Sequence, residues 1–313
     1  MKKQFALLLA GVMLLTGCSL GAAPEPVDPN FPVTVGDLVM ERRPAMVFSL
    51  TPAADEMVAD LGFSELLAGV SDLCDLPAMA ALPRVGGAYE PDITAIAEAF
   101  IPTTYEDKKT GEMLPGEPIT GPKLVVTTVP LTDADLVALQ QESVQVLCLP
   151  RASSVQGIKD NYRALALALG GTENGAAAAE AVSSAMDSKL TEAKAVLKAL
   201  SEPMDAALLV EYPYCMATGD TLEGQLLAEL GFTCSGGAYT GWLYPESELA
   251  ALEPDVIFCA KEDEVETVEA SYEYRSVAAA KNGKVTAIDF TAFERQSLRM
   301  WDLLAEMARF AAE

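Results

Sequence analysis

Aromatic side chains cluster in the C-terminal half of the chain, where they could form contact surfaces for a flat or bulky ligand. Five of them fall within 33 residues: Tyr212, Tyr214, Tyr239, Trp242 and Tyr244. Tyr and Trp offer a large rigid contact area that ends in a polar tip. In the other half, Tyr89 follows two glycines, which let a backbone approach a ligand closely. We expect Trp242 and Tyr89 to act as facing platforms; the alternative is that Tyr212 and Tyr244 only pack at strand ends.

Two arginines follow the last predicted strand. Arg295 and Arg299 stand in the segment Phe293-Glu294-Arg295-Gln296-Ser297-Leu298-Arg299. A guanidinium at this place could meet a carboxylate or catecholate group of a ligand. The alternative is an ion pair with Glu294 or a neighbouring acid.

The chain contains no histidine, and this excludes several kinds of enzyme site. Ser-His-Asp triads, Cys-His nucleophiles and HExxH zinc sites cannot form. The formal net charge of −25 repels phosphate backbones, so we expect no nucleic-acid partner. No motif supports an enzyme; a surface enzyme that uses carboxylate or Tyr chemistry is the less favoured alternative.

Cysteines give no clear metal or redox centre. Apart from Cys18, the chain has five, an odd number that cannot all pair: Cys74, Cys148, Cys215, Cys234 and Cys259. One disulfide in the C-terminal half stays open, because spacing cannot decide it. Asp72, Cys74 and Asp75 are close in sequence, but three residues on one loop make a poor metal site, and we predict none.

The N-terminus has the pattern of a bacterial export signal. Two lysines precede an apolar run over residues 5–15, which predicts a secretory signal peptide at 1–17. The following Leu15-Thr16-Gly17-Cys18 resembles a lipobox, in which Cys18 carries the lipid; the alternative is a plain signal. Residues 18–44, rich in proline at their start, are then predicted to be a lipid-anchored tether.

Strand and helix patterns alternate through the N-terminal half, over 45–152. Strands are predicted at 46–50, 66–70, 124–128 and 144–149. Thr51 and Pro52 form a helix start, a hydroxyl cap followed by proline, and that helix should stop at Gly62. This alternation predicts a parallel sheet with helices on its faces. Residues 102–121 interrupt the pattern with a turn signal at Asp107 to Glu112, read as an exposed hairpin; the alternative is a disordered loop.

The C-terminal half, 204–313, repeats the plan. Strands are predicted at 206–212, 232–234, 255–260 and 285–289, with a final helix over 294–311. The segment 153–203 between the halves reads as two helices, one ending at Gly170-Gly171 and one from Thr172 to about Leu200. The second would be roughly 40 Å long. A single long rigid helix is therefore expected to join two α/β lobes.

Four stretches of the chain resemble one protein family. They are residues 47–56, which include Ser49-Leu50-Thr51-Pro52, residues 69–77, residues 83–91, and residues 252–257 with the later 278–285. In this order, and with the lipobox, they are similar to the substrate-binding lipoproteins of ABC importers for ferric siderophores, haem and cobalamin. The resemblance covers essentially the whole mature chain. It implies two Rossmann-like lobes with a ligand cleft between them, and residues 102–121 are an insertion relative to the family.

The resemblance also implies a permease partner. Family members usually place a Glu on each lobe to meet permease arginines, and by register those positions hold Thr94 and Ser247 here. The nearby acids on the same rim are expected to substitute. They are Glu90 and Asp92 on one lobe and Glu246 and Glu248 on the other. An orphan ligand binder or sensor without a permease is the alternative.

Ligands of open parallel sheets bind beyond the carboxyl ends of the strands. This rule adds Ser49 and Asp72 to the expected ligand contacts, beside the aromatic residues and Arg295. The resemblance implies a metal chelate as ligand and no covalently bound cofactor. A corrinoid, which carries its own metal and many amides, is slightly favoured over a ferric siderophore or haem. We expect a monomer on the outer side of the cell membrane, held there by its lipid.

Overall fold

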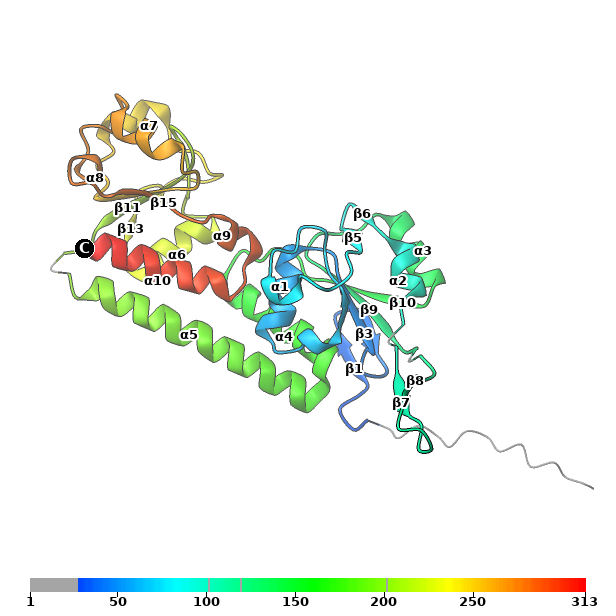
Figure 1. Ribbon diagram of the computed structural model, residues 1–313. Coiled ribbons are helices and arrows are strands. Elements are labelled where there is room, and N and C mark those ends of the chain that lie inside the picture. The colour runs from blue at the N-terminus through cyan, green and yellow to red at the C-terminus, as the bar shows by residue number, and fades with distance from the viewer. Residues whose placement is uncertain (1–27, 101, 119, 201) are drawn as a thin grey trace, which may run out of the picture.

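The computed structural model describes residues 28–100, 102–118, 120–200 and 202–313. It has two α/β lobes, one built from the N-terminal and one from the C-terminal half of the chain (Figure 1). The predicted signal peptide and Cys18 lie outside the described residues. Among those described, no helix combines the length and apolar character that a membrane span requires.

The N-terminal lobe is built on a four-stranded sheet in the order β10-β9-β3-β4, in which every neighbouring pair is parallel. Its strands are β3 (Met46–Ser49), β4 (Leu67–Gly69), β9 (Lys123–Thr127) and β10 (Val144–Cys148). Val47 joins one apolar cluster, whereas Met46 and Phe48 join another, because successive side chains point to opposite faces. Both faces are therefore covered, and the strands read as uninterrupted apolar runs.

Helices on both faces of this sheet begin at capping residues. They are α1 (Pro52–Asp60), α2 (Ile93–Glu98), α3 (Asp133–Gln141) and α4 (Val155–Gly170), with the short 3-10 turns η1 (Ser64–Leu66) and η2 (Pro77–Met79). Thr51 accepts a hydrogen bond from the backbone N–H of Ala54 at 3.3 Å, as its predicted role as a cap requires. Gly62 follows α1 with a φ of +76°, which glycine adopts without strain.

A hairpin precedes the first sheet strand and corrects the predicted tether. Strands β1 (Val33–Val35) and β2 (Leu38–Met40) pair antiparallel. Val33 and Met40 are buried and join the larger apolar cluster, so the hairpin packs on the lobe. The tether predicted for 18–44 is wrong over this part, because alternating apolar residues give the segment an inward face.

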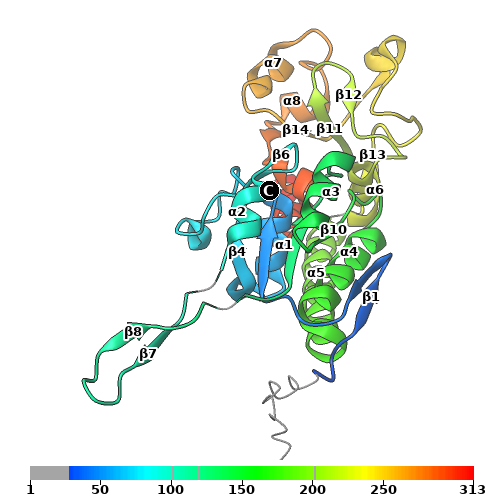
Figure 2. The same ribbon diagram turned by 90° about the vertical axis from the view of Figure 1, so that its right-hand side faces the viewer.

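Two further hairpins belong to the N-terminal lobe. Strands β5 (Gly86–Gly87) and β6 (Glu90–Pro91) form a tight one, and β7 (Thr104–Glu106) and β8 (Met113–Pro115) form a longer one. The second hairpin falls within the segment 102–121 and stands away from the lobe (Figure 2).

The C-terminal lobe has a five-stranded sheet with the path β12-β11-β14-β15, and β13 also pairs with β11. Its strands are β11 (Asp205–Glu211), β12 (Cys215–Met216), β13 (Thr233–Cys234), β14 (Val256–Cys259) and β15 (Val285–Ala287). Its helices are α6 (Leu222–Leu230), the 3-10 helix η4 (Glu246–Ala251), α7 (Glu264–Ala270), α8 (Ala278–Lys281), α9 (Thr291–Arg295) and α10 (Leu298–Ala312). All strand pairs of this sheet are parallel except β11 with β12. The sequence did not predict strand β12.

The final helix predicted over 294–311 is wrong at its start. The chain breaks between α9 and α10 at Gln296, which has a φ of +54°. This conformation is uncommon for residues other than glycine. The buried Gln296 amide compensates for it, since it donates to the carbonyl of Ala152 at 2.8 Å and accepts from the Ala152 N–H at 2.9 Å.

The connecting helices form an antiparallel pair. Helix α4 is followed by the π-helical turn η3 (Gly171–Gly175) and by α5 (Ala176–Lys198). Lys159 and Asp187, 28 residues apart, form an ion pair at 2.6 Å. In a straight helix they would be about 42 Å apart, so the chain folds back at η3. Of these two helices, only α5, roughly 35 Å long, runs from one lobe to the other.

Helix α10 lies along α5 and thickens this connection (Figure 1). Met186 and Leu190 of α5 share one apolar cluster with Trp301 and Leu304 of α10. That cluster also contains strand residues of both lobes, so the connection is packed along its length. The predicted architecture of two α/β lobes joined by a long helix is confirmed, although the packing of the final helix along α5 was not predicted.

Candidate functional site

A cleft of about 810 Å³ lies at the junction of the two lobes. The N-terminal lobe lines it with loops that follow β3, β4 and β9 and with the turn between β5 and β6, while α9 of the other lobe closes one side. The lining residues are Leu50, Thr51, Pro52, Ala53, Ser71, Asp72, Leu73, Gly87, Ala88, Tyr89, Glu90, Thr128, Val129, Thr291, Glu294 and Arg295. Most of this wall is apolar or carries a neutral hydroxyl.

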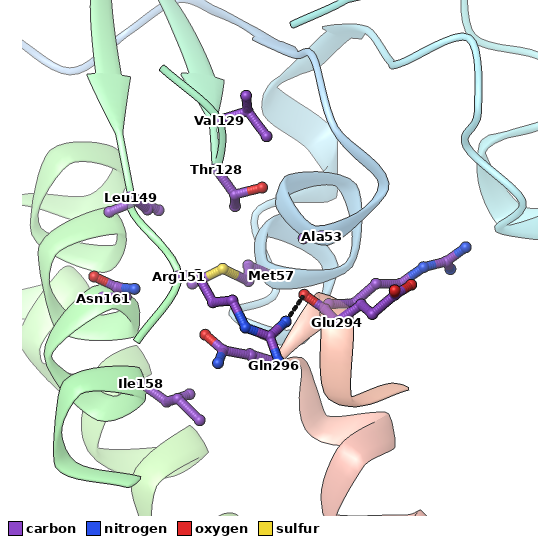
Figure 3. A pocket seen from close by; sticks show the side chains of 11 residues that line it. Ala53, Met57, Thr128, Val129, Leu149, Arg151, Ile158, Asn161, Glu294 and Gln296 are labelled. Atoms are coloured by element: carbon purple, nitrogen blue, oxygen red, sulfur yellow. Dashed lines mark hydrogen bonds between the residues drawn. The ribbon is translucent and has the colours of Figure 1, made fainter. Parts of the chain in front are cut away.

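A smaller chamber of about 160 Å³ adjoins the cleft and shares five lining residues with it. Figure 3 shows Arg151 between Met57 and Gln296, with Nη1 donating to the backbone oxygen of Glu294 at 3.3 Å. Its Nη2 donates to Glu223, a buried residue of α6, at 2.7 Å. The chamber therefore contains a guanidinium that is already paired with a carboxylate.

The rim near Tyr89 depends on a glycine turn. Asp72 accepts a hydrogen bond from the Gly86 N–H at 3.2 Å. Gly86 has a φ of +82°, and a Cβ there would lie 2.3 Å from the carbonyl oxygen of Glu90. Only glycine fits at this position because the turn is tight. The turn presents Tyr89 with 86% of its surface exposed. Leu73, on the neighbouring loop, is 75% exposed and adds a second apolar contact surface.

The guanidinium of Arg295 is fully engaged in ion pairs that connect the two lobes. Its guanidinium donates to both carboxylate oxygens of Asp75, at 2.8 and 2.9 Å, and to Glu56 at 2.5 Å. The hydrogen bonds to Asp75 raise the pKa of Arg295 above its ordinary value, and Arg295 lowers the pKa of Asp75. Glu56, almost fully buried, also accepts from Arg299 and from the hydroxyl of Ser297. The sequence left an ion pair with Glu294 or a neighbouring acid as the alternative to ligand binding; the structure pairs Arg295 with two carboxylates of the N-terminal lobe instead.

Of the predicted ligand contacts, only Tyr89, Asp72 and Arg295 line the cleft. Ser49 does not, because it is fully buried and donates to the backbone oxygen of Thr51. It lies beneath the cleft wall, near the buried carboxylate of Asp55, whose pKa is raised by desolvation.

The aromatic residues of the C-terminal lobe pack mainly on their own surroundings. Trp242 packs edge-to-face against Phe290, with ring centroids 6.4 Å apart. Tyr239 packs against the buried Tyr244 at 4.9 Å, and its hydrogen bond to Glu248 raises the pKa of Tyr239 to about 12.

Tyr212 completes this pattern, since it packs against Tyr274 and donates to Glu273 at 2.7 Å. Tyr214 is 38% exposed. None of the five predicted aromatic residues of this lobe is among the residues lining the cleft, so as ligand contacts they stay predictions.

The predicted docking acids lie on the surfaces of both lobes. Glu90 is exposed at the rim of the cleft, and Asp92 caps α2 by accepting from the Ala95 N–H at 2.9 Å. Glu246 and Glu248 are exposed on η4. Within the part of the chain that the structure describes, the carboxylates of Glu90 and Glu246 have no hydrogen-bond or ion-pair partner.

Metal-binding groups and disulfides are absent from the described residues. No group of three or more acids or cysteines is placed to hold a metal ion there. The five cysteines in this part of the chain are all free. On the loop that follows β4, Cys74 is buried and Asp75 is paired with Arg295.

Sequence reasoning missed Leu73, Arg151 and Glu294 as parts of the site. Arg151 comes shortly after β10, so the rule that places ligands at strand carboxyl ends could have found it. Leu73 and Glu294 stand inside loops that the rule selected, but a leucine and one more acid in an acidic chain gave no separate signal.

Comparison with known proteins identifies relatives with this architecture. The chain matches the family described as periplasmic binding protein over residues 120–292, more than half of its 313 residues. YvrC, an ABC transporter substrate-binding lipoprotein of Bacillus subtilis, is 23% identical over 321 residues, which cover 97% of this chain and 94% of the relative.

Solved structures share the fold at low sequence identity. The periplasmic haem-binding protein RhuT from Roseiflexus sp. RS-1 superposes with a TM-score of 0.62 at 15% identity, covering 86% of this chain and 98% of RhuT. The periplasmic vitamin B12-binding protein BtuF of Vibrio cholerae gives a TM-score of 0.58 at 18% identity, covering 85% and 96%.

These matches confirm the resemblance that four short motifs indicated. The family match covers most of the C-terminal lobe together with the connecting helices, and the structural matches extend over both lobes. The chain therefore belongs to the periplasmic binding protein family.

Proposed function

We propose that the protein is an extracytoplasmic substrate-binding protein that captures a metal chelate and delivers it to an ABC importer. The observation that carries the proposal is the cleft of about 810 Å³ between two lobes, lined at the carboxyl ends of parallel strands. Pockets for small molecules typically have 300–1,000 Å³ and mainly apolar walls. Family membership supports transport rather than catalysis, and the chain has no histidine for acid-base chemistry.

A corrinoid is the slightly favoured ligand, ahead of a ferric siderophore or haem. A chelate brings its own metal, which suits a cleft whose wall is apolar, hydroxyl-bearing and acidic. Haem iron would need an axial ligand other than histidine. Tyr89 and Leu73 are the proposed contact surfaces on the N-terminal lobe, and Asp72 the polar contact beside them.

Permease docking is proposed for the acids at the rims of the lobes. Asp92 is committed to capping α2, and Glu248 accepts from Tyr239. Glu90 and Glu246 are therefore the more available pair for permease arginines. A pull-down with the permease should lose recovery in Glu90→Gln and Glu246→Gln; full recovery in both would exclude these docking residues. Capture of no permease by the wild type would favour the orphan binder.

Membrane anchoring is proposed through a lipid on Cys18. Growth with a radioactive fatty acid should label the wild type but not Cys18→Ala, and the variant should leave the membrane fraction. Equal membrane retention of both would contradict the anchor.

Calorimetric titration of the purified full-length chain tests the ligand class. The panel contains cyanocobalamin, ferrioxamine B, ferric enterobactin and haemin. We expect one of these chelates to bind with a Kd in the micromolar range or tighter. Absence of heat across the whole panel, with the fold intact by circular dichroism, would refute the proposal.

A further inference from the structure

The cations that border the cleft are paired with carboxylates, whereas several of the acids there are not paired with a cation of the described residues. Two cations are present, Arg295 in the cleft wall and Arg151 in the adjoining chamber. Arg295 is paired with two carboxylates, and Arg151 with one. Neither guanidinium brings an unmatched positive charge to a ligand.

The carboxylates of three exposed acids of the same wall, in contrast, are not paired with a cation in the part of the chain that the structure describes, although Arg84 and Arg151 donate to backbone oxygens of Ser71 and Glu294 nearby. Asp72 and Glu90 lie on the N-terminal lobe and Glu294 on α9 of the other lobe. Among the described residues, none of the three forms a salt bridge. The other residues of the wall, apart from Arg295, carry no charge, so the cleft presents a negative potential from both lobes.

Releasing Arg295 for an anionic ligand would be costly. The side chain of Glu56 is only 3% exposed, and Arg295 is one of its two cationic partners. Weakening the pairing of a buried carboxylate is strongly unfavourable, and Asp75 would lose a two-point contact at the same time. The arginine is therefore held in its place by the fold.

We propose that this cleft selects metal chelates without net negative charge, and that Asp72, Glu90 and Glu294 set the selection. This inference rests on the proposed function and narrows its ligand class. An anion entering the cleft would lose hydration and meet three unpaired carboxylates, while the charge of Arg295 is already balanced by Glu56 and Asp75. Neutral corrinoids and neutral or cationic hydroxamate chelates fit this wall, whereas haem with its two carboxylates and ferric catecholates do not.

Matched probes separate charge from shape. Cyanocobalamin is compared with its monocarboxylic acid, in which one side-chain amide is hydrolysed. The cationic ferrioxamine B is compared with its anionic N-succinyl derivative. In at least one pair we expect the anionic member to bind wild-type protein at least tenfold more weakly, because each exposed charge contributes about two- to fivefold.

Variants show whether the wall or the overall charge is responsible. In the triple variant Asp72→Asn, Glu90→Gln, Glu294→Gln, the anionic member of that pair should bind no more than about threefold more weakly than the other member. The control variant Glu41→Gln, Glu253→Gln, Glu269→Gln removes the same charge from exposed positions outside the cleft and should leave the difference unchanged.

The possible outcomes are distinct. Equal or tighter binding of the anionic member overturns the charge selection and leaves the proposed function standing. If the affinity difference between the two members of the pair falls equally in the control variant and in the cleft variant, the effect is due to net charge. This result also overturns the inference. Binding of neither pair, with haemin or ferric enterobactin bound in the calorimetric panel, overturns the charge selection and leaves the proposed function standing. Absence of binding by every chelate refutes both.

Discussion

Tyr89 allows a mutational test in which ligand affinity and protein stability separate cleanly. Its side chain is 86% exposed on the turn between β5 and β6, so Tyr89→Ala removes almost no packing within the protein. The melting temperature should change little. Any loss of affinity then reports contact between ligand and ring.

The size of the effect follows from the exposed area. A tyrosine ring that is fully covered buries about 150–250 Å². A ligand stacked on one face would cover about half of the exposed part, or about 65–110 Å², worth about 1.6–2.7 kcal/mol at ~25 cal/mol per Å². Tyr89→Ala should therefore weaken binding about 15- to 100-fold.

Isothermal titration calorimetry with the tightest-binding chelate measures the change. Tyr89→Phe keeps the ring and should bind within about threefold of the wild type. Tyr272→Ala is the matched control, since this tyrosine is 81% exposed on the C-terminal lobe and does not line the cleft. Unchanged affinity in Tyr89→Ala, or an equal loss in Tyr272→Ala, would refute the assignment.

Three further predictions concern the junction and the aromatic residues. Glu56→Ala removes the buried partner of Arg295 and should lower the free energy of unfolding by about 3–5 kcal/mol in urea denaturation; a loss below about 1 kcal/mol would contradict the ion-pair account. Because Arg295 lowers the pKa of Asp75, that carboxylate stabilises the fold above its unfolded-state pKa near 4, and the contribution disappears as the pH falls through the lower folded-state value. The stability difference between wild type and Asp75→Asn should accordingly shrink in acid, and a constant difference down to pH 2 would argue against it. Trp242→Ala tests the predicted second ligand platform and should weaken chelate binding at least tenfold; a loss of about 1–3 kcal/mol of stability with less than threefold change in affinity would instead restrict Trp242 to its packing against Phe290.

Local sequence determined most of the architecture, because the decisive signals act over a few residues. The cap at Thr51, the proline after it and the glycine at 62 set the limits of α1 wherever the rest of the chain lies. Apolar runs such as 124–127 indicated strands buried on both faces, and their alternation with helices indicated parallel sheets.

Long-range pairing explains what the sequence left undecided. Arg295 contacts Asp75 and Glu56, which are 220 and 239 residues away, and no local pattern identifies either partner. The break at Gln296 likewise depends on Ala152, 144 residues away. A helical pattern through residues 294–311 therefore predicted one helix where there are two.

The candidate site was predicted in outline but not in detail. The rule that ligands bind beyond the carboxyl ends of parallel strands selected Asp72 and the turn that carries Tyr89, because it depends only on the order of the strands. The aromatic cluster in the C-terminal lobe was a weaker guide. Closeness in sequence brings Tyr239 and Tyr244 to each other rather than to the cleft.

A crystal structure of the complex with the tightest-binding chelate tests the central claim most directly. We expect the chelate to lie between the lobes, in contact with Tyr89 and Leu73 on one side and with α9 on the other. A chelate bound elsewhere on the protein, with the cleft between the lobes left free of ligand, would contradict it.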